Sequence, residues 1–166
     1  MLPRDHNELN RIRVECYWIV TQRAALSGGA ALVPLPGVDI AADIGLLLQL
    51  IPEINRRFGL DPSQIDQYDI QTKMFIYNLI INMGATIAGQ VITKELILIL
   101  FKKVGVRVTA KQVTKYIPFV GQAVAGILSF TAMKLLCDHH VNECYSIVKT
   151  YIDTNPGESG DNQARV

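Results

Sequence analysis

The sequence predicts an all-α fold: a single helical bundle built from two apolar helical hairpins with flanking amphipathic helices. Three observations support this. Capping residues precede apolar runs with helical spacing, no segment shows sustained strand alternation, and a Pro-x-x-Gly motif occurs twice between apolar stretches. Proline cannot continue a helix from its N-terminal side, and glycine permits backbone angles that other residues resist. Pro34, Pro36 and Gly37 therefore predict one tight corner between helices, and Pro118 and Gly121 predict a second.

The first half of the chain carries clear helix start and stop signals. Asp5 and Glu8 form a capping-box pattern, so a helix is expected from there toward residue 34. A second helix follows Asp39, whose carboxylate can accept hydrogen bonds from free backbone N–H groups at the helix start. Gly59 is a natural C-terminal stop for this second helix.

A third start signal consists of Asp61 as the N-cap, Pro62 in the first turn and Gln64 at the capping-box position. A long apolar helix, or two joined helices, is expected to cover residues 69–101. Lysines and a glycine after this segment supply its stop.

The last third is predicted to hold three helices. Thr109 and Gln112 form a capping box for a short helix that ends at the second corner. One helix then runs to about residue 137, and a separate amphipathic helix begins near residue 141. The polar, glycine-rich residues 155–166 predict a disordered tail. Residues 1–4 form a short N-terminal tail, which leaves residues 5–154 as one helical domain.

The composition limits the classes of function. A chain of 166 residues fits one domain with a real core. Hydrophobic residues make up 49% and charged residues 19%, which is below the usual quarter. A net charge of +1 argues against a basic nucleic-acid binder, and 7% aromatic residues offer no obvious platform for stacking bases. We therefore expect no nucleic-acid partner.

The cysteines and the N-terminus indicate the compartment. Cys16, Cys137 and Cys144 are odd in number and lack the spacing of a disulfide framework. Buried free thiols in a reducing compartment are expected. The first residues are polar and charged where a signal peptide needs an apolar run. The sequence thus predicts a cytoplasmic protein that is not secreted.

Two apolar segments raise the question of a membrane. Residues 74–93 and 116–133 contain no charged side chain and are borderline in length for a span. Basic residues cluster between them, and we call residues 102–115 the basic segment. Two interpretations stay open: helices of a compact core with a solvated basic loop, or a peripheral contact in which apolar corners enter the interface and the basic segment meets anionic lipid. Full spanning is the weaker alternative, because the polar N-terminal region lacks an export signal.

One cluster of residues could carry chemistry. Cys137, His140 and Cys144 share one helix face and could present three ligands to zinc, but a local fourth ligand is missing, and core packing explains the cysteines better. Asp39 and Asp43 stand one turn apart, yet a helix cap and a salt bridge explain them better than acid–base catalysis. No phosphate-binding Gly-x-x-x-x-Gly-Lys-Ser/Thr loop occurs. We expect no catalytic residues, no metal and no cofactor.

Several short motifs point to a family. Residues 34–39, then Gln49, then Phe58 and Gly59, resemble the helical domain of the YcjF-like group of bacterial proteins. That group also carries a later Ile-Pro-x-x-Gly motif, here residues 117–121, followed by a helix of small residues. The same pattern is similar to the helical part of the immunity-related, interferon-inducible GTPases. The resemblance covers roughly residues 17–151.

The resemblance implies a helical module that is attached to, or works beside, a Ras-like or Era-like GTP-binding domain, often at membranes. This sequence contains no such GTP-binding domain, so GTP hydrolysis does not carry over. The leading hypothesis is a non-catalytic interaction module that is membrane-associated. The residues expected to carry the contact are Pro34, Pro36, Gly37, Lys102, Lys103, Arg107, Lys111, Lys115, Pro118 and Gly121.

Two other functions stay open. The first is a soluble regulator or partner subunit of a separate GTPase. The second is a small metal-dependent enzyme that uses Cys137, His140 and Cys144. Among partners, the alternatives are a GTPase, an anionic membrane surface and a second copy of the chain.

Overall fold

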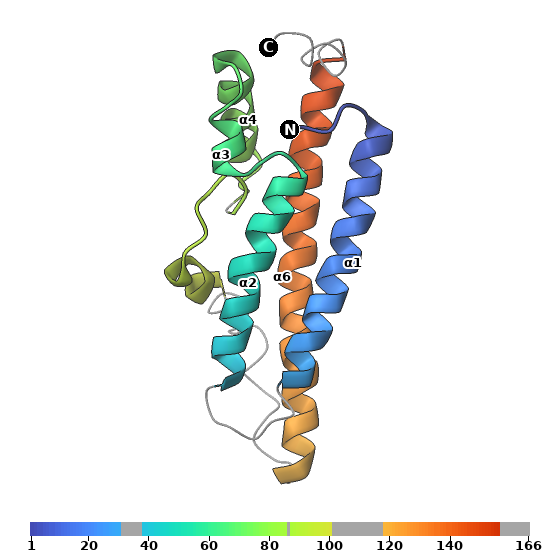
Figure 1. The fold of residues 1–166 in the computed structure, drawn as a ribbon, viewed down its shortest axis with the longest axis vertical. Coiled ribbons are helices and arrows are strands. Elements are labelled where there is room, and N and C mark those ends of the chain that lie inside the picture. Colours follow the sequence, from blue (N-terminus) through green and yellow to red (C-terminus); the bar gives the residue numbers. More distant parts are fainter. Residues whose placement is uncertain (31–37, 86, 101–117, 157–166) are drawn as a thin grey trace. The chain divides into compact units, whose positions relative to one another are not determined.

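The structure is a computed structural model that describes residues 1–30, 38–85, 87–100 and 118–156. These residues form helices and no strand, which confirms the predicted all-α class (Figure 1). The helices are α1 (His6–Ala30), α2 (Val38–Arg57), α3 (Pro62–Ile65), α4 (Ile70–Asn82) and α6 (Pro118–Thr154), and residues 94–100 are also helical. Within this described part, no helix combines the length and the apolar character that crossing a membrane requires.

The chain separates into two compact units, and α1, α2 and α6 each contribute to both. The first unit comprises Met1–Tyr17, Pro52–Val91 and His139–Val166. The second comprises Trp18–Ile51 and Ile92–Asp138. Buried side chains in the second unit come from each of its helical segments and include Val20, Leu47, Ile97, Met133 and Leu136.

The core of the first unit joins the start of α1, the end of α2 and the end of α6. Its fully buried side chains include Leu9, Cys16, Ile54, Phe58, Val141 and Ile147. Helix α4 adds Ile76 and Ile80 to the buried set, and the ring of Phe75 lies 6.1 Å from the ring of Tyr151 on α6. One side of α4 therefore packs inward within this unit.

Helix α2 ends at the glycine that the sequence predicts as its stop. Gly59 has a φ of 73°, a backbone angle that residues with a side chain rarely adopt. The Gly59 N–H donates to the Arg56 carbonyl at 3.2 Å, and the Leu60 N–H donates to the Asn55 carbonyl at 2.8 Å. These two bonds form a Schellman motif, which satisfies carbonyl groups that the helix end leaves free.

The predicted start of the next helix is also confirmed. The Asp61 side chain accepts a hydrogen bond from the Ser63 N–H at 3.0 Å, while the Gln64 side chain accepts one from the Asp61 N–H at 3.4 Å. This reciprocal pair is the capping box that the sequence indicates. The resulting helix, α3, is only 4 residues long.

Helix α4 begins at a second acidic cap. The Asp69 carboxylate accepts hydrogen bonds from the Thr72 N–H at 3.0 Å and from the Gln71 N–H at 2.9 Å. Hydrogen bonds from Thr72, and after them the one from Gln71, lower the pKa of Asp69 below its ordinary value. The ionised carboxylate is therefore the form that the folded protein favours.

Replacing Asp69 with alanine is expected to lower the free energy of unfolding by about 1 kcal/mol at neutral pH, because the cap is lost. Since the pKa of Asp69 is lower in the folded state, its contribution is present above the ordinary pKa of 3.8 and is lost as the pH falls through the folded value. Urea denaturation at pH 7 and pH 3 measures both effects. Asp69→Asn, which keeps an accepting oxygen, is the control and should lose less; equal losses would contradict the cap.

One long helix or two joined helices were expected over residues 69–101; the single helix is wrong, and the two helices that the structure describes there are separated and not joined. Helix α4 ends at Asn82, and residues 94–100 form a separate helix after a stretch that is not helical in its described residues. Gly84 has a φ of 65°, its N–H donates to the Ile81 carbonyl at 3.1 Å, and the Ala85 N–H donates to the Ile80 carbonyl at 3.1 Å. This repeats the Schellman motif found at Gly59, so a glycine inside an apolar run ends the helix.

Two further expectations are corrected in α6. A junction between two helices was expected near residues 137–141, but α6 is one helix of 37 residues. It contains no proline or glycine from residue 127 to residue 154, and the pairs Lys134–Asp138 and His139–Glu143 lie one turn apart along it. Pro118 is its first residue, which suits a helix start, but Gly121 also lies inside the helix. The second Pro-x-x-Gly motif is therefore the first turn of a helix and not a turn between helices.

Candidate interaction surface

Most residues predicted to carry a contact lie outside the described part of the chain. These are Pro34, Pro36 and Gly37 of the first corner and Lys102, Lys103, Arg107, Lys111 and Lys115 of the basic segment. The expected short helix after Thr109 and the expected disorder of residues 157–166 also fall there. Pro118 and Gly121 are placed only as backbone positions of α6. The contact through the first corner, the basic segment and the first turn of α6 stays a prediction.

The proposed zinc ligands do not form a metal site. Cys16, Cys137 and Cys144 are buried free thiols, as predicted. His140 and Cys144 lie together, with the Cys144 sulfur 3.6 Å from His140 Nε2. Across the described ranges, however, no three His, Cys, Asp or Glu side chains come close enough to hold a metal ion. The arrangement gives the metal-dependent enzyme no support.

His140 and Cys144 instead form a buried polar cluster with Asn55 of α2. His140 Nε2 lies 2.9 Å from Asn55 Oδ1, and the Cys144 thiol donates to the same oxygen at 3.6 Å. On its other side, His140 Nδ1 lies 3.5 Å from Glu143 Oε2. Asn55 Nδ2 has no hydrogen-bond partner. The cluster links α2 to α6 inside the first unit by polar contacts in a largely apolar core.

A cysteine, a histidine and an asparagine in contact can form a nucleophilic site, but the electrostatics here oppose it. Burial raises the pKa of the Cys144 thiol well above its ordinary value, and burial lowers the pKa of His140. Both shifts favour the neutral thiol and neutral imidazole over the thiolate–imidazolium pair that nucleophilic catalysis uses. Cys144 and His140 are fully buried and Asn55 nearly so, so a substrate cannot reach the sulfur while the helices stay packed. The cluster is structural.

Polar side chains on α1 make specific contacts with α6 in the first unit. The Arg13 guanidinium lies 4.4 Å from the centre of the Tyr145 ring and 5.6 Å from that of Tyr17. Arg13 and the Tyr17 hydroxyl both donate to Asn142 Oδ1, at 2.8 Å and 2.7 Å. These contacts hold the helices together, so they do not form an open binding site.

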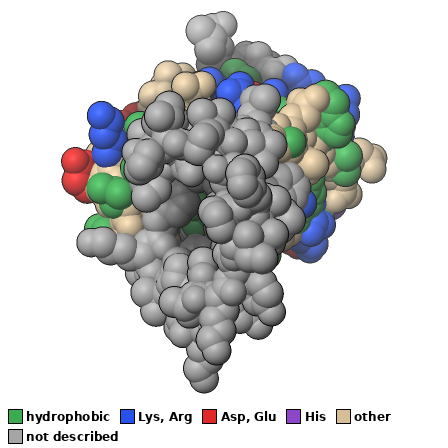
Figure 2. Space-filling model, turned by 90° about the horizontal axis from the view of Figure 1, so that it is seen from below, with side chains coloured by type: hydrophobic (Ala, Val, Ile, Leu, Met, Phe, Trp, Pro, Cys, Tyr) green, Lys and Arg blue, Asp and Glu red, His purple; other side chains and the backbone are tan. Residues whose placement is uncertain are grey.

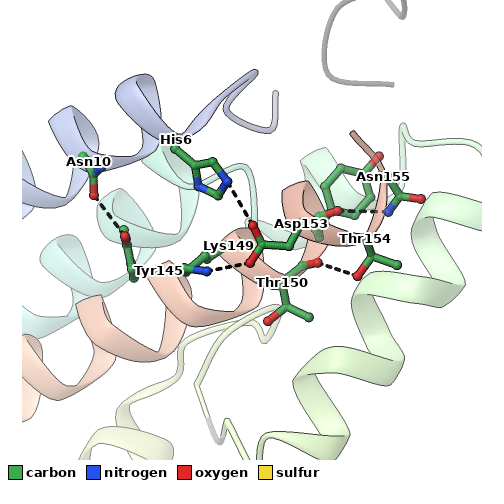
Figure 3. Close-up of polar contacts among 9 residues, drawn as sticks. His6, Asn10, Tyr145, Lys149, Thr150, Asp153, Thr154 and Asn155 are labelled. Atoms are coloured by element: carbon green, nitrogen blue, oxygen red, sulfur yellow. Dashed lines mark hydrogen bonds and ion pairs between the residues drawn. The ribbon is translucent and has the colours of Figure 1, made fainter. Parts of the chain in front are cut away.

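The end of α6 is fixed in the same way near the start of α1 (Figure 3). His6 Nε2 lies 2.9 Å from Asp153 Oδ1, and the Tyr145 hydroxyl donates to Asn10 Oδ1 at 3.0 Å. Lys149 also reaches Asp153 from one turn earlier on α6. These polar groups therefore have partners within the unit.

A different kind of surface lies on α4. Ile70, Met74 and Ile81 are 77%, 61% and 73% exposed, although isoleucine and methionine are usually buried. Successive residues of a helix are rotated by about 100° around its axis. This rotation places the three side chains and that of Asn78, which is also exposed, within an arc of about 80° on one side of α4. We call these four residues the α4 face.

The α4 face carries no charge. Lys73 is the one charged residue of α4, and it forms an ion pair with Asp66. The opposite side of the helix is the packed one, where Thr72, Ile76 and Ile80 are buried. Thus α4 turns a threonine inward and two isoleucines outward.

Sequence reasoning missed this surface for a physical reason. A helix that is apolar all round is expected to be buried or to lie in a membrane, and periodicity cannot say which side faces the core. Residues 70–82 are apolar on both sides, so they were assigned to a core helix or a candidate span. The spacing of Ile70, Met74 and Ile81 was visible in the sequence, but only their exposure identifies them.

Other apolar side chains are also exposed. In the first unit, Val14 is 68% and Val91 74% exposed; in the second, Trp18 is 63% exposed. Figure 2 shows one face on which described hydrophobic side chains reach the surface between Lys and Arg side chains.

Comparisons with models of protein families, with curated proteins and with solved structures found no match to this chain. The resemblance to the YcjF-like group and to the helical part of immunity-related GTPases therefore rests on the motifs in the sequence alone.

Proposed function

We propose that this chain is a non-catalytic helical interaction module that associates with the surface of a membrane on its cytoplasmic side. The observation that carries the proposal is the α4 face, on which three large apolar side chains are exposed in line and no charged residue lies. Exposed apolar patches of this kind are typical of protein or membrane contact sites. By contrast, Arg13, His140 and His6 of the first unit are engaged in internal contacts.

The sequence adds a second element to the proposal. The basic segment contains Lys102, Lys103, Arg107, Lys111 and Lys115 and no acid, and each basic residue near an anionic surface contributes about 1 kcal/mol of attraction. The first Pro-x-x-Gly motif keeps its proposed role as an apolar corner, and the apolar first turn of α6 takes the place of the second corner. In this proposal, electrostatic attraction brings the chain to the membrane and apolar side chains enter the interface.

Sedimentation with vesicles tests the function. The full chain is expected to sediment with vesicles that contain anionic phospholipid at low salt, and raising the salt to about 0.5 M should weaken binding, because charges are then screened within a few ångströms. Replacing Lys102, Lys103 and Arg107 with glutamine should remove most of the binding that depends on salt. If the wild-type chain stays in the supernatant with every kind of vesicle at low salt, the proposed membrane association is wrong.

The alternative is a regulator or partner subunit of a separate GTPase, in which a protein covers the exposed apolar side chains. The resemblance favours it, and in this alternative the exposed apolar side chains would be the contact with the partner. Capture of a nucleotide-binding protein by the wild-type chain, lost when Ile70 and Ile81 are replaced by glutamine, would favour this alternative over lipid.

A further inference from the structure

We propose that α4 lies along the surface of a phospholipid bilayer, with the α4 face inserted at the boundary between headgroups and acyl chains. This inference rests on the proposed function and adds the element that enters the membrane and the chemistry that it meets. The α4 face should enter bilayers of zwitterionic lipid as well as anionic lipid, because the contact is apolar. The basic segment is a separate contact with its own dependence on salt.

The geometry of α4 suits a helix lying flat. Its 13 residues span about 20 Å, and Ile70 and Ile81 place apolar side chains near both ends of that length. A helix that lies in the interface buries its apolar side by about 5–10 Å. Because Ile70, Met74 and Ile81 are in line, all three can reach that depth together.

The helix is held in place before it meets lipid. Ile76 and Ile80 are buried on its inner side, and the ring of Phe75 contacts the ring of Tyr151 on α6. Hydrogen bonds to Asp69 fix the start of α4, and those around Gly84 fix its end. No ordering of the helix is needed on binding, which lowers the entropic cost of the contact.

The size of the surface argues against a second copy of the chain or another large protein. A standard protein interface uses about 20–30 residues and about 800 Å² on each side. The α4 face consists of three large apolar side chains and one amide on a helix whose other side is packed inward. A lipid surface needs neither that area nor matching shape, because acyl chains adapt to whatever side chain enters.

Charge also favours a lipid interface. The α4 face has no charged residue that would pair with a protein partner, and Lys73 at its edge is already paired with Asp66. The exposed amides of Asn78 and Asn82 can hydrogen-bond to headgroups while Ile81, which lies beside them, enters the acyl region. Little positive charge is left on α4 to attract anionic lipid, so its attachment should depend weakly on salt.

The test uses vesicles of phosphatidylcholine, which is zwitterionic, at about 0.5 M salt, where attraction by the basic segment is screened. The full chain is compared with Ile70→Gln/Met74→Gln/Ile81→Gln, which keeps good helix formers on α4. We expect the triple variant to bind at least about tenfold more weakly. The matched control, Val14→Gln/Val91→Gln, removes equally exposed apolar side chains of the same unit and should bind within about twofold of wild type.

Each outcome decides between the ideas. If wild type binds only anionic vesicles at low salt, or if the triple variant binds phosphatidylcholine like wild type, the α4 inference is overturned while membrane association stands. If wild type binds no vesicle at all, both fail. A triple variant that loses dimerisation seen in wild type by size-exclusion chromatography would assign the α4 face to a second copy and also overturn the inference. Circular dichroism and thermal unfolding must match wild type for the variant to count.

Discussion

Replacing Gly59 with alanine is expected to lower the free energy of unfolding by about 2–3 kcal/mol. Two effects add at this position. The φ of 73° is unfavourable for any residue with a Cβ atom, and an added Cβ would lie 2.7 Å from the Met1 carbonyl oxygen and 2.8 Å from the Leu2 nitrogen. Both neighbours are backbone atoms, which cannot rotate out of the way as a flexible side chain would.

Gly84→Ala provides the matched control, because it separates the two effects. Gly84 has a similar φ of 65°, but an added Cβ would meet nothing within 4 Å. Its replacement should therefore cost only the strain of the backbone angle, about 1 kcal/mol. Chemical denaturation of both variants measures the difference. Equal losses would mean that the segment of Met1 and Leu2 does not pack over Gly59 in solution.

Replacing His140 with alanine is expected to have the largest effect on stability, a loss of about 3 kcal/mol or more. The substitution opens a cavity in a fully buried site and leaves Asn55 Oδ1 without its contact to the ring. Thermal or urea unfolding measures the loss. Exposed His139 on the same helix is the control, and His139→Ala should stay within about 0.5 kcal/mol of wild type.

His140 should also make the protein sensitive to mild acid. Burial lowers the pKa of His140 in the folded state, an effect opposed by the Glu143 carboxylate and reinforced by His139, so the unfolded chain binds the proton more tightly. Stability therefore rises with pH through this range and is lost as the pH falls below the ordinary value of 6.5 toward the folded pKa. The unfolding free energy of wild type should fall between pH 7 and pH 5 more steeply than that of His140→Gln. Parallel curves would contradict the shift.

Helix boundaries that depend on neighbouring residues could be predicted from the sequence. The caps at Asp61 and the stop at Gly59 use hydrogen bonds within a few residues, and both were identified. Gly84 forms the same stop as Gly59, but it stands within a long apolar run, where the sequence left one long helix and two joined helices both open. A glycine between two hydrophobic residues is therefore as good a signal for the end of a helix as a glycine beside charged residues.

Features that depend on tertiary contacts could not be predicted in this way. The histidine of the expected zinc face turns to Asn55, which is 85 residues away in the chain and gave no local signal. The inward side of α4 was equally hidden, since Thr72 is buried while Ile70 is exposed. Both outcomes depend on which helix packs against which, and no spacing within one helix encodes that choice.

The two glycine stops have a consequence for how this chain can change over evolutionary time. Hydrogen bonds around Gly59 and Gly84 set where α2 and α4 end, and they use only backbone atoms within six consecutive residues. Substitutions at Ile70, Met74 or Ile81 leave these bonds untouched, because the three side chains point to solvent. The outer side of α4 can thus drift toward a new binding preference by single mutations, while the length and position of the helix are inherited unchanged.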